Sequence, residues 1–269
     1  MPAIGQHVML RLRDDRVIAP NEVTQRLLAR AVLKRAMHLH LLAFRAADTH
    51  LHLLVGLDES TARSRMGHLQ SALTQVLARG TGFTPARLKA IENQRHLGRT
   101  FFYILRQDTH HDFQHDPLHE ASNIPDLVGM RVLDTTCREN VRRSLPRVRD
   151  KDILESVGWT SLGQDQVSTV RPSLDGLKQA AAAAFGLRTL HGRGNAQVKA
   201  RIAASHLVAH DHTPTEIAAA LHVAARNIRF YLQQDVARHW VTAVARQQKL
   251  RIETPHQCPS RAAVDRKRP

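Results

Sequence analysis

One short apolar run that carries two histidines constrains the fold of this chain more than any other feature: Thr49-His50-Leu51-His52-Leu53-Leu54-Val55-Gly56-Leu57. In an extended strand, alternate side chains share a face. His50 and His52 are therefore expected on one face, a polar one, and the alternating apolar residues on the other, where they can reach a core. The two imidazoles would lie about 7 Å apart along the strand. So placed, they can bind one divalent cation if a third ligand comes from elsewhere in the chain.

The residue patterns on either side of this run predict an α+β fold with an antiparallel sheet. Leu41 to Ala46 has the pattern of a second strand, and Ala47-Asp48 that of a tight turn joining the two. Further strands are expected at 7–13 and 86–91, and helices at 22–37, 59–79 and 94–107. The resulting order is strand, helix, two strands, helix, strand, helix, which is typical of helices packed against an antiparallel sheet.

The helix expected at 94–107 carries one of only two tyrosines in the chain. Tyr103 and Gln107 are four residues apart, so they should share one face of this helix. The apolar stripe of the helix is formed by Leu97, Phe101, Ile104 and Leu105. Considered alone, Tyr103 fits an ordinary core or surface aromatic residue. His-x-His can also arise by chance among 18 histidines, and a second copy is present at His38 and His40.

Taken together, the His-x-His strand and the Tyr-x-x-x-Gln helix resemble the single-tyrosine HUH nucleases, in particular the REP-associated tyrosine transposases and the IS200-like transposases. The resemblance covers roughly residues 5–135 and implies a ferredoxin-like palm. It implies that Tyr103 attacks single-stranded DNA, keeps a 5′-phosphotyrosine link and frees a 3′-OH. It also implies that Mg²⁺ or Mn²⁺, held by His50, His52 and Gln107, polarises the scissile phosphate. His111 lies four residues beyond Gln107 and is an alternative third ligand.

The strongly basic composition favours a polyanionic partner. Lysines and arginines number 39 against 24 acidic residues, which gives a formal net charge of +15. Nucleic acid is the commonest partner for such an excess, and the alternative is a merely basic soluble protein. Cys137 and Cys258 form no metal or disulfide pattern, and the chain has no run of about 18 apolar residues. We therefore expect a cytoplasmic, nucleoid-associated protein with no membrane partner. The resemblance implies that it acts on single-stranded DNA that contains hairpin-forming repeats.

The second half of the chain predicts a separate helical domain. Residues 136–173 are charged and irregular and are expected to form a linker after a catalytic domain at 1–135. Helices are expected at 176–185 and 196–209 within a domain that spans 174–250. The remaining residues, 251–269, have the composition of a disordered basic tail.

The segment from Thr213 to Leu232 resembles a helix-turn-helix, the DNA-binding unit carried by some transposases. Thr213, Pro214 and Glu216 form a capping box at the start of its first helix. His222 stands at the turn position that glycine usually occupies. The resemblance implies that the second helix enters the major groove of duplex DNA. Its reading side chains would be Arg226, Asn227, Arg229 and Gln233.

Three functions remain open from the sequence. The first is the metal-dependent single-strand endonuclease and strand transferase that the resemblance implies. The second is a DNA-binding regulator that is catalytically inactive or domesticated and acts through the helix-turn-helix. The third is a zinc protein that uses the histidine-rich stretch 110–119, whose spacing matches no established zinc pattern.

Overall fold

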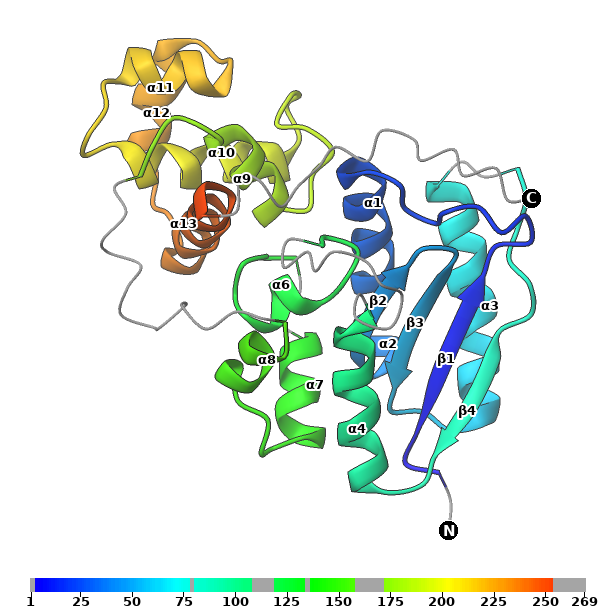
Figure 1. The fold of residues 1–269 in the computed structure, drawn as a ribbon. Coiled ribbons are helices and arrows are strands. Elements are labelled where there is room, and N and C mark those ends of the chain that lie inside the picture. Colours follow the sequence, from blue (N-terminus) through cyan, green and yellow to red (C-terminus); the bar gives the residue numbers. More distant parts are fainter. Residues whose placement is uncertain (1–2, 78–79, 108–118, 134–135, 158–171, 254–269) are drawn as a thin grey trace.

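A computed structural model describes residues 3–77, 80–107, 119–133, 136–157 and 172–253. Across these ranges the protein is an α+β fold that contains one four-stranded antiparallel sheet and twelve helices (Figure 1). The expected α+β class with an antiparallel sheet is therefore confirmed. No helix within the same ranges combines the length and the apolar character that crossing a bilayer requires.

The sheet is built from β1 (Gly5–Arg11), β2 (Leu41–Ala47), β3 (His50–Val55) and β4 (Arg87–Ile91). The strands lie in the order β2-β3-β1-β4, and every neighbouring pair is antiparallel. A tight turn joins β2 to β3, as the sequence predicts, and Asp48 in this turn adopts a left-handed conformation with φ of +51°. The hairpin places β3 in the middle of the sheet, where both of its faces can be covered.

Helices cover both faces of this sheet. On one face, α1 (Glu22–Leu33) packs against α3 (Glu59–Val76). On the other face, α4 (Gln94–Leu105) packs over β2 and β3, and α7 (Thr136–Ser144) packs over β2 (Figure 1). Because α4 covers the face that carries the histidines, β3 is buried on both sides. The expectation of a polar face on this strand is wrong for that reason.

The expected order of elements from β1 to α4 is confirmed, and the differences lie at the ends of elements. The single helix predicted at 22–37 is divided into α1 and the four-residue helix α2 (Ala36–Leu39). The helix predicted at 94–107 ends earlier, at Leu105. The short strand predicted at 86–91 is present as β4.

Residues 136–156 do not form the irregular linker that their high charge suggests. They contain α7 and α8 (Asp150–Ser156), which follow the short helix α6 (Ile124–Leu127). Cys137, Val141 and Leu145 are buried in the same core as the sheet. These residues recur every four positions, so they form a helical apolar stripe, which the many arginines between them conceal in the sequence.

A second core is formed by helices of the C-terminal half. These helices are α9 (Leu177–Ala184), α10 (Asn195–Val208), α11 (Pro214–Leu221), α12 (Ala225–Leu232) and α13 (Arg238–Glu253). The helices expected at 176–185 and 196–209 are confirmed as α9 and α10. The sequence did not predict α13, which extends to Glu253, so residues 251–253 are helical rather than the start of a disordered tail. Residues 254–269 lie outside the described part of the chain.

Helix α13 connects the two cores. Ala243 and Val244 are buried in the second core, whereas Leu250 is buried in the first. Near the same end of α13, Gln247 Nε2 donates a hydrogen bond of 3.2 Å to the carbonyl oxygen of Met130. The two halves of the molecule are therefore packed together through the last turns of this helix.

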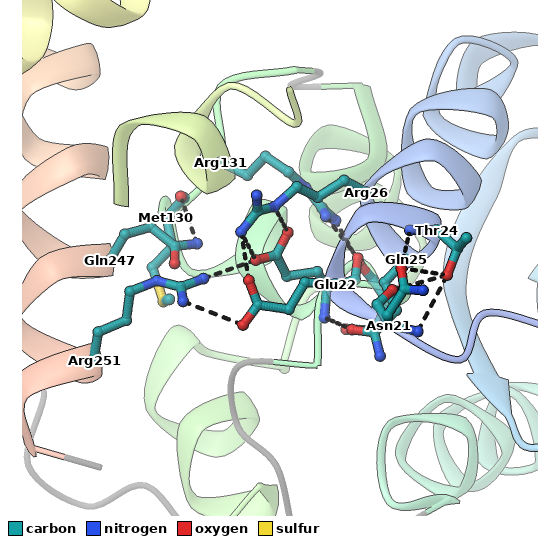
Figure 2. Close-up of polar contacts among 11 residues, drawn as sticks. Asn21, Glu22, Thr24, Gln25, Arg26, Met130, Arg131, Gln247 and Arg251 are labelled. Atoms are coloured by element: carbon teal, nitrogen blue, oxygen red, sulfur yellow. Dashed lines mark hydrogen bonds and ion pairs between the residues drawn. The ribbon is translucent and has the colours of Figure 1, made fainter. Parts of the chain in front are cut away.

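An ion network around the buried Glu120 and Arg26 reinforces this connection, and Figure 2 shows Arg26, Glu22 and Arg251 of this network. Glu120 is 2% exposed, and its Oε1 accepts hydrogen bonds of 2.8 Å from Nη2 of both Arg26 and Arg251. The Nε of Arg26 also donates to Oε2 of Glu120, and Glu22 accepts a further bond of 2.8 Å from Arg26. Burial lowers the pKa of the Arg26 guanidinium, but the hydrogen bonds and the charges of the two glutamates raise it further, so the net shift is upward. The network thus keeps its charges fully paired.

Candidate active site

His50 and His52 lie side by side on the face of β3 that α4 covers. Their ring centroids are 4.6 Å apart with the planes at 71°, so the rings tilt toward each other and lie closer than their spacing along the strand suggests. His52 is only 4% exposed, while His50 is half-buried at the end of the strand. The expected pair of neighbouring imidazoles is therefore present.

Helix α4 brings Tyr103 to this pair of histidines. The side chain of Asn93 caps the helix, accepting a hydrogen bond of 2.9 Å from the backbone N–H of His96. The predicted apolar stripe is buried against the sheet, which leaves Tyr103 on the outer side, 39% exposed. Its ring centroid is 6.0 Å from that of His52, in an edge-on arrangement at 89°. The two motifs, about fifty residues apart in the sequence, thus meet in space.

Arg45 fixes the end of α4 beside the histidines, and sequence reasoning missed it. It is fully buried, and its Nη1 donates a hydrogen bond of 2.9 Å to the carbonyl oxygen of Leu105. The last carbonyls of a helix lack intrahelical partners and carry partial negative charge. A guanidinium placed there donates the missing hydrogen bond and also offsets this charge. Arg45 is also the cross-strand neighbour of His52. The signal in the sequence was an arginine inside an otherwise apolar strand.

Gln107 is located differently from what helical spacing predicts. Because α4 ends at Leu105, Gln107 lies beyond the helix and does not share a face with Tyr103. It is fully buried, and its Nε2 donates a hydrogen bond of 3.2 Å to the carbonyl oxygen of Tyr103. Its Oε1 is buried and accepts no hydrogen bond from the described residues. Within the same residues, Gln107 forms no hydrogen bond with His50 or His52.

Two imidazoles and one amide oxygen, the ligands that the resemblance implies, would suit a modestly bound hard cation better than a structural zinc ion. An orphaned buried amide oxygen is a suitable ligand for Mg²⁺ or Mn²⁺, and imidazole accepts Mn²⁺ and related metals. In the ranges that the structure describes, no group of three or more His, Cys, Asp or Glu side chains is arranged to hold a metal ion. The alternative ligand His111 and most of the stretch 110–119 lie outside these ranges. His119, which is described, has its Nε2 3.0 Å from the carbonyl oxygen of Ala46.

His7 is a further member of the site that sequence reasoning missed. It lies on β1, and its Nε2 is 2.9 Å from Nδ1 of His52. The rings of His7 and His52 are stacked with centroids 5.2 Å apart, and the ring of Tyr103 is 5.9 Å from that of His7. Burial, together with the nearby positive charges of Lys89 and His96, lowers the pKa of His7 to about 4. At neutral pH the imidazole is therefore uncharged.

The contact between His7 and His52 bears on whether His52 can act as a metal ligand. A neutral His7 can accept a hydrogen bond at Nε2 from the Nδ1–H of His52. In that tautomer, the lone pair of His52 lies on Nε2, the nitrogen on the other side of its ring. Histidines that bind metals in proteins are typically held in this way by a partner on the second nitrogen.

Three of the predicted reading side chains lie on α12, and the fourth, Gln233, is the C-cap residue of this helix. Arg226, Arg229 and Gln233 are exposed, and Asn227 is partly exposed. The connection from α11 to α12 is short, and His222 caps α11 in the left-handed conformation with φ of +53°. The predicted capping box at Thr213 and Glu216 is present. Phe230, which sequence reasoning did not select, lies among these side chains and is 57% exposed.

Comparisons with known proteins give no match: neither protein-family models, nor curated proteins, nor solved structures resemble this chain closely enough to be recorded as similar.

Proposed function

We propose that this chain is a metal-dependent endonuclease and strand transferase for single-stranded DNA, of the single-tyrosine HUH type. The observation that carries the proposal is the position of Tyr103, whose exposed ring lies 6.0 Å from the ring of His52. Three other features support it: the neighbouring His50, the orphaned amide oxygen of Gln107 and the net charge of +15. The alternation of strands and helices and the sheet order β2-β3-β1-β4 also support the proposal, because both are expected of the ferredoxin-like palm that it includes.

In the proposed reaction, the phenol oxygen of Tyr103 attacks the phosphorus of a phosphodiester. A bond forms between this oxygen and phosphorus, and the bond from phosphorus to the 3′ oxygen breaks. The phenol loses its proton, and the 3′ oxygen gains one and leaves as a free 3′-OH. The product is a 5′-phosphotyrosine link, which a 3′-OH can later attack to rejoin the strand.

The chain's own residues orient this step. Arg45 and the buried stripe of α4 hold Tyr103 beside the histidine pair, and His7 orients the ring of His52. His50, His52 and Gln107 would hold the divalent cation. Mg²⁺ or Mn²⁺ bound there would supply positive charge that stabilises the developing charge on the phosphate.

The proposal is tested by covalent capture of DNA. Incubating the full chain with Mn²⁺ and labelled single strands that contain hairpins should give an adduct that survives a denaturing gel. Tyr103→Phe removes the attacking oxygen, so the adduct should fall by on the order of a thousandfold or more. His50→Ala should weaken it.

Tyr231→Phe provides a matched control for this experiment. Tyr231 is the only other tyrosine of the chain and is buried in the second core. The adduct should therefore remain in Tyr231→Phe. Retention of the adduct in Tyr103→Phe would overturn the assignment of the nucleophile.

A second candidate function is a DNA-binding regulator that acts through α11 and α12 as a helix-turn-helix. The observation that favours it is that Arg226 and Arg229 on α12 and the C-cap residue Gln233 are all exposed. Tight duplex binding by the full chain that is lost in R226A/R229A, combined with the absence of any adduct in the wild type, would make this the better function.

A further inference from the structure

The outward face of α4 carries positive charge that the described part of the chain does not neutralise. Arg95 and Arg99 are exposed, and neither forms an ion pair with a described acidic side chain. The sequence of α4 contains no acidic residue at all. By contrast, Arg63 on α3 is paired with Glu59 at 2.6 Å. The charge on α4 is therefore available to an external anion.

These arginines line a groove of about 540 Å³ that also contains Tyr103. The groove is lined by Gln94, Arg95, Gly98, Arg99, Phe102, Tyr103 and Arg106. Arg95, Arg99 and Tyr103 follow one another at intervals of four residues, which is about 6 Å along a helix axis. They thus form one stripe, along which two guanidinium groups lead to the phenol.

The far end of the groove carries a third cation. The guanidinium carbon of Arg106 lies 5.6 Å from the centroid of the Phe102 ring, so its charge is held against an apolar surface next to Tyr103. Lys89 of β4 adds another positive charge on the same side of the sheet, where it is the cross-strand neighbour of His7. The surroundings of Tyr103 are therefore basic on both the helix and the sheet.

We infer that this groove, here named the α4 track, binds the sugar–phosphate backbone of single-stranded DNA and leads it to Tyr103. The inference rests on the proposed function and specifies where its substrate lies. Guanidinium groups pair with phosphate oxygens in a bidentate geometry, and a row of them along one helix follows one backbone. The α4 track is distinct from α12, on which the second candidate function places the contacts with duplex DNA.

The test compares two variants that each lose two positive charges. R95A/R99A removes the two arginines of the α4 track, and R63A/R65A removes two exposed arginines of α3, on the opposite face of the sheet. Binding of a fluorescent single strand of about 16 nucleotides to the full chain is measured by anisotropy at several salt concentrations. This readout does not require cleavage.

For R95A/R99A, the Kd for the single strand should rise about tenfold, and the slope of log Kd against log salt should fall by about 1.4, since each phosphate contact on a single strand contributes about 0.7. R63A/R65A should change the Kd less than about twofold, and duplex binding should respond to both variants alike. Equal single-strand affinities and equal slopes in the two variants would overturn the inference.

The outcomes also separate this inference from the proposed function. If wild type forms no covalent adduct but R95A/R99A still reduces the salt slope, the inference about the α4 track is supported and the proposed nuclease function is rejected. If wild type forms the adduct while R95A/R99A binds and reacts like R63A/R65A, the proposed nuclease function is supported and the inference about the α4 track is rejected.

Discussion

His7 shows how the sheet sets the chemistry of a single side chain in the candidate site. It is half-buried against His52, and positive charges lie close to it, so its pKa falls from about 6.5 to about 4. The unfolded chain has no such environment and binds a proton at a higher pH than the folded chain does. Between these two values the unfolded state therefore carries more protons, and folding stability rises with pH.

We expect the free energy of unfolding to decrease as the pH falls from about 6.5 to about 4, with a contribution from His7 of at most about 3 kcal/mol. His7→Asn should make the pH dependence shallower in this window, because the group that titrates is gone. Urea unfolding at several pH values measures the effect. The control is His68→Asn, which replaces an exposed histidine on α3. If both variants keep the slope of the wild type, the environment of His7 has been misjudged.

Some residues of the candidate site could be predicted from the sequence, and others could not. His50, His52 and Tyr103 were found because a two-residue spacing on a strand and a tyrosine on an amphipathic helix are local signals. His7 and Arg45 were missed, because what makes them important is the strand that lies next to them. Sheet register is a tertiary property, which one isolated strand pattern does not reveal.

Among the elements, the helix pair α11–α12 depends on one residue in an unfavourable conformation. His222 ends α11 with φ of +53°, in the left-handed region, where a side chain with a Cβ atom costs about 1–2 kcal/mol and glycine does not. Glycine usually occupies this place in helix-turn-helix motifs, whereas this chain has His222 there. The conformation therefore explains why the substitution is unusual.

We predict that His222→Gly raises the free energy of unfolding by about 0.5–1 kcal/mol, which is the relief of strain minus the greater freedom of glycine in the unfolded chain. Thermal unfolding measures it. His212→Gly is the matched control, since His212 lies just before α11 and is not in the left-handed region. That variant should be neutral or less stable. A destabilised His222→Gly would show that the imidazole makes a contact worth more than the strain.

The helices and strands with a clear apolar periodicity are those that the sequence predicts well. The sheet, α1, α3 and α4 have clear periodicity and were located within a few residues. By contrast, α7 and α8 are rich in arginine and aspartate, so their short apolar stripe did not stand out. Helix α13 was missed for a similar reason, because its two ends pack against different cores.

For the molecule as a whole, Glu120 is the carboxylate on which the two halves converge. Arg26 comes from α1 and Arg251 from α13, and both donate to Glu120. Glu120→Gln keeps the shape of the side chain but leaves the buried guanidinium of Arg26 and the partly buried one of Arg251 with less opposing charge. Removing one partner of a buried ion pair typically costs about 3–5 kcal/mol.

We therefore expect Glu120→Gln to lower the free energy of unfolding by about 3 kcal/mol, while the exposed Glu155→Gln on α8 changes it by less than about 0.5 kcal/mol. Urea titration followed by fluorescence distinguishes them. Trp240 lies on α13 and Trp159 is the other tryptophan of the sequence, so in a Trp159→Phe background the emission also reports whether this helix leaves its position first. Equal stabilities for the two variants would mean that the ion network contributes nothing net.

The position of α13 also sets an order of events during protein synthesis. Leu250 completes the first core, and Arg251 completes an ion network that includes Glu22, which is made more than two hundred residues earlier. On the ribosome, the N-terminal half emerges and begins to fold while the place of Leu250 is still exposed to water. A chaperone that binds apolar surface has that interval in which to act, and the interval ends when α13 emerges.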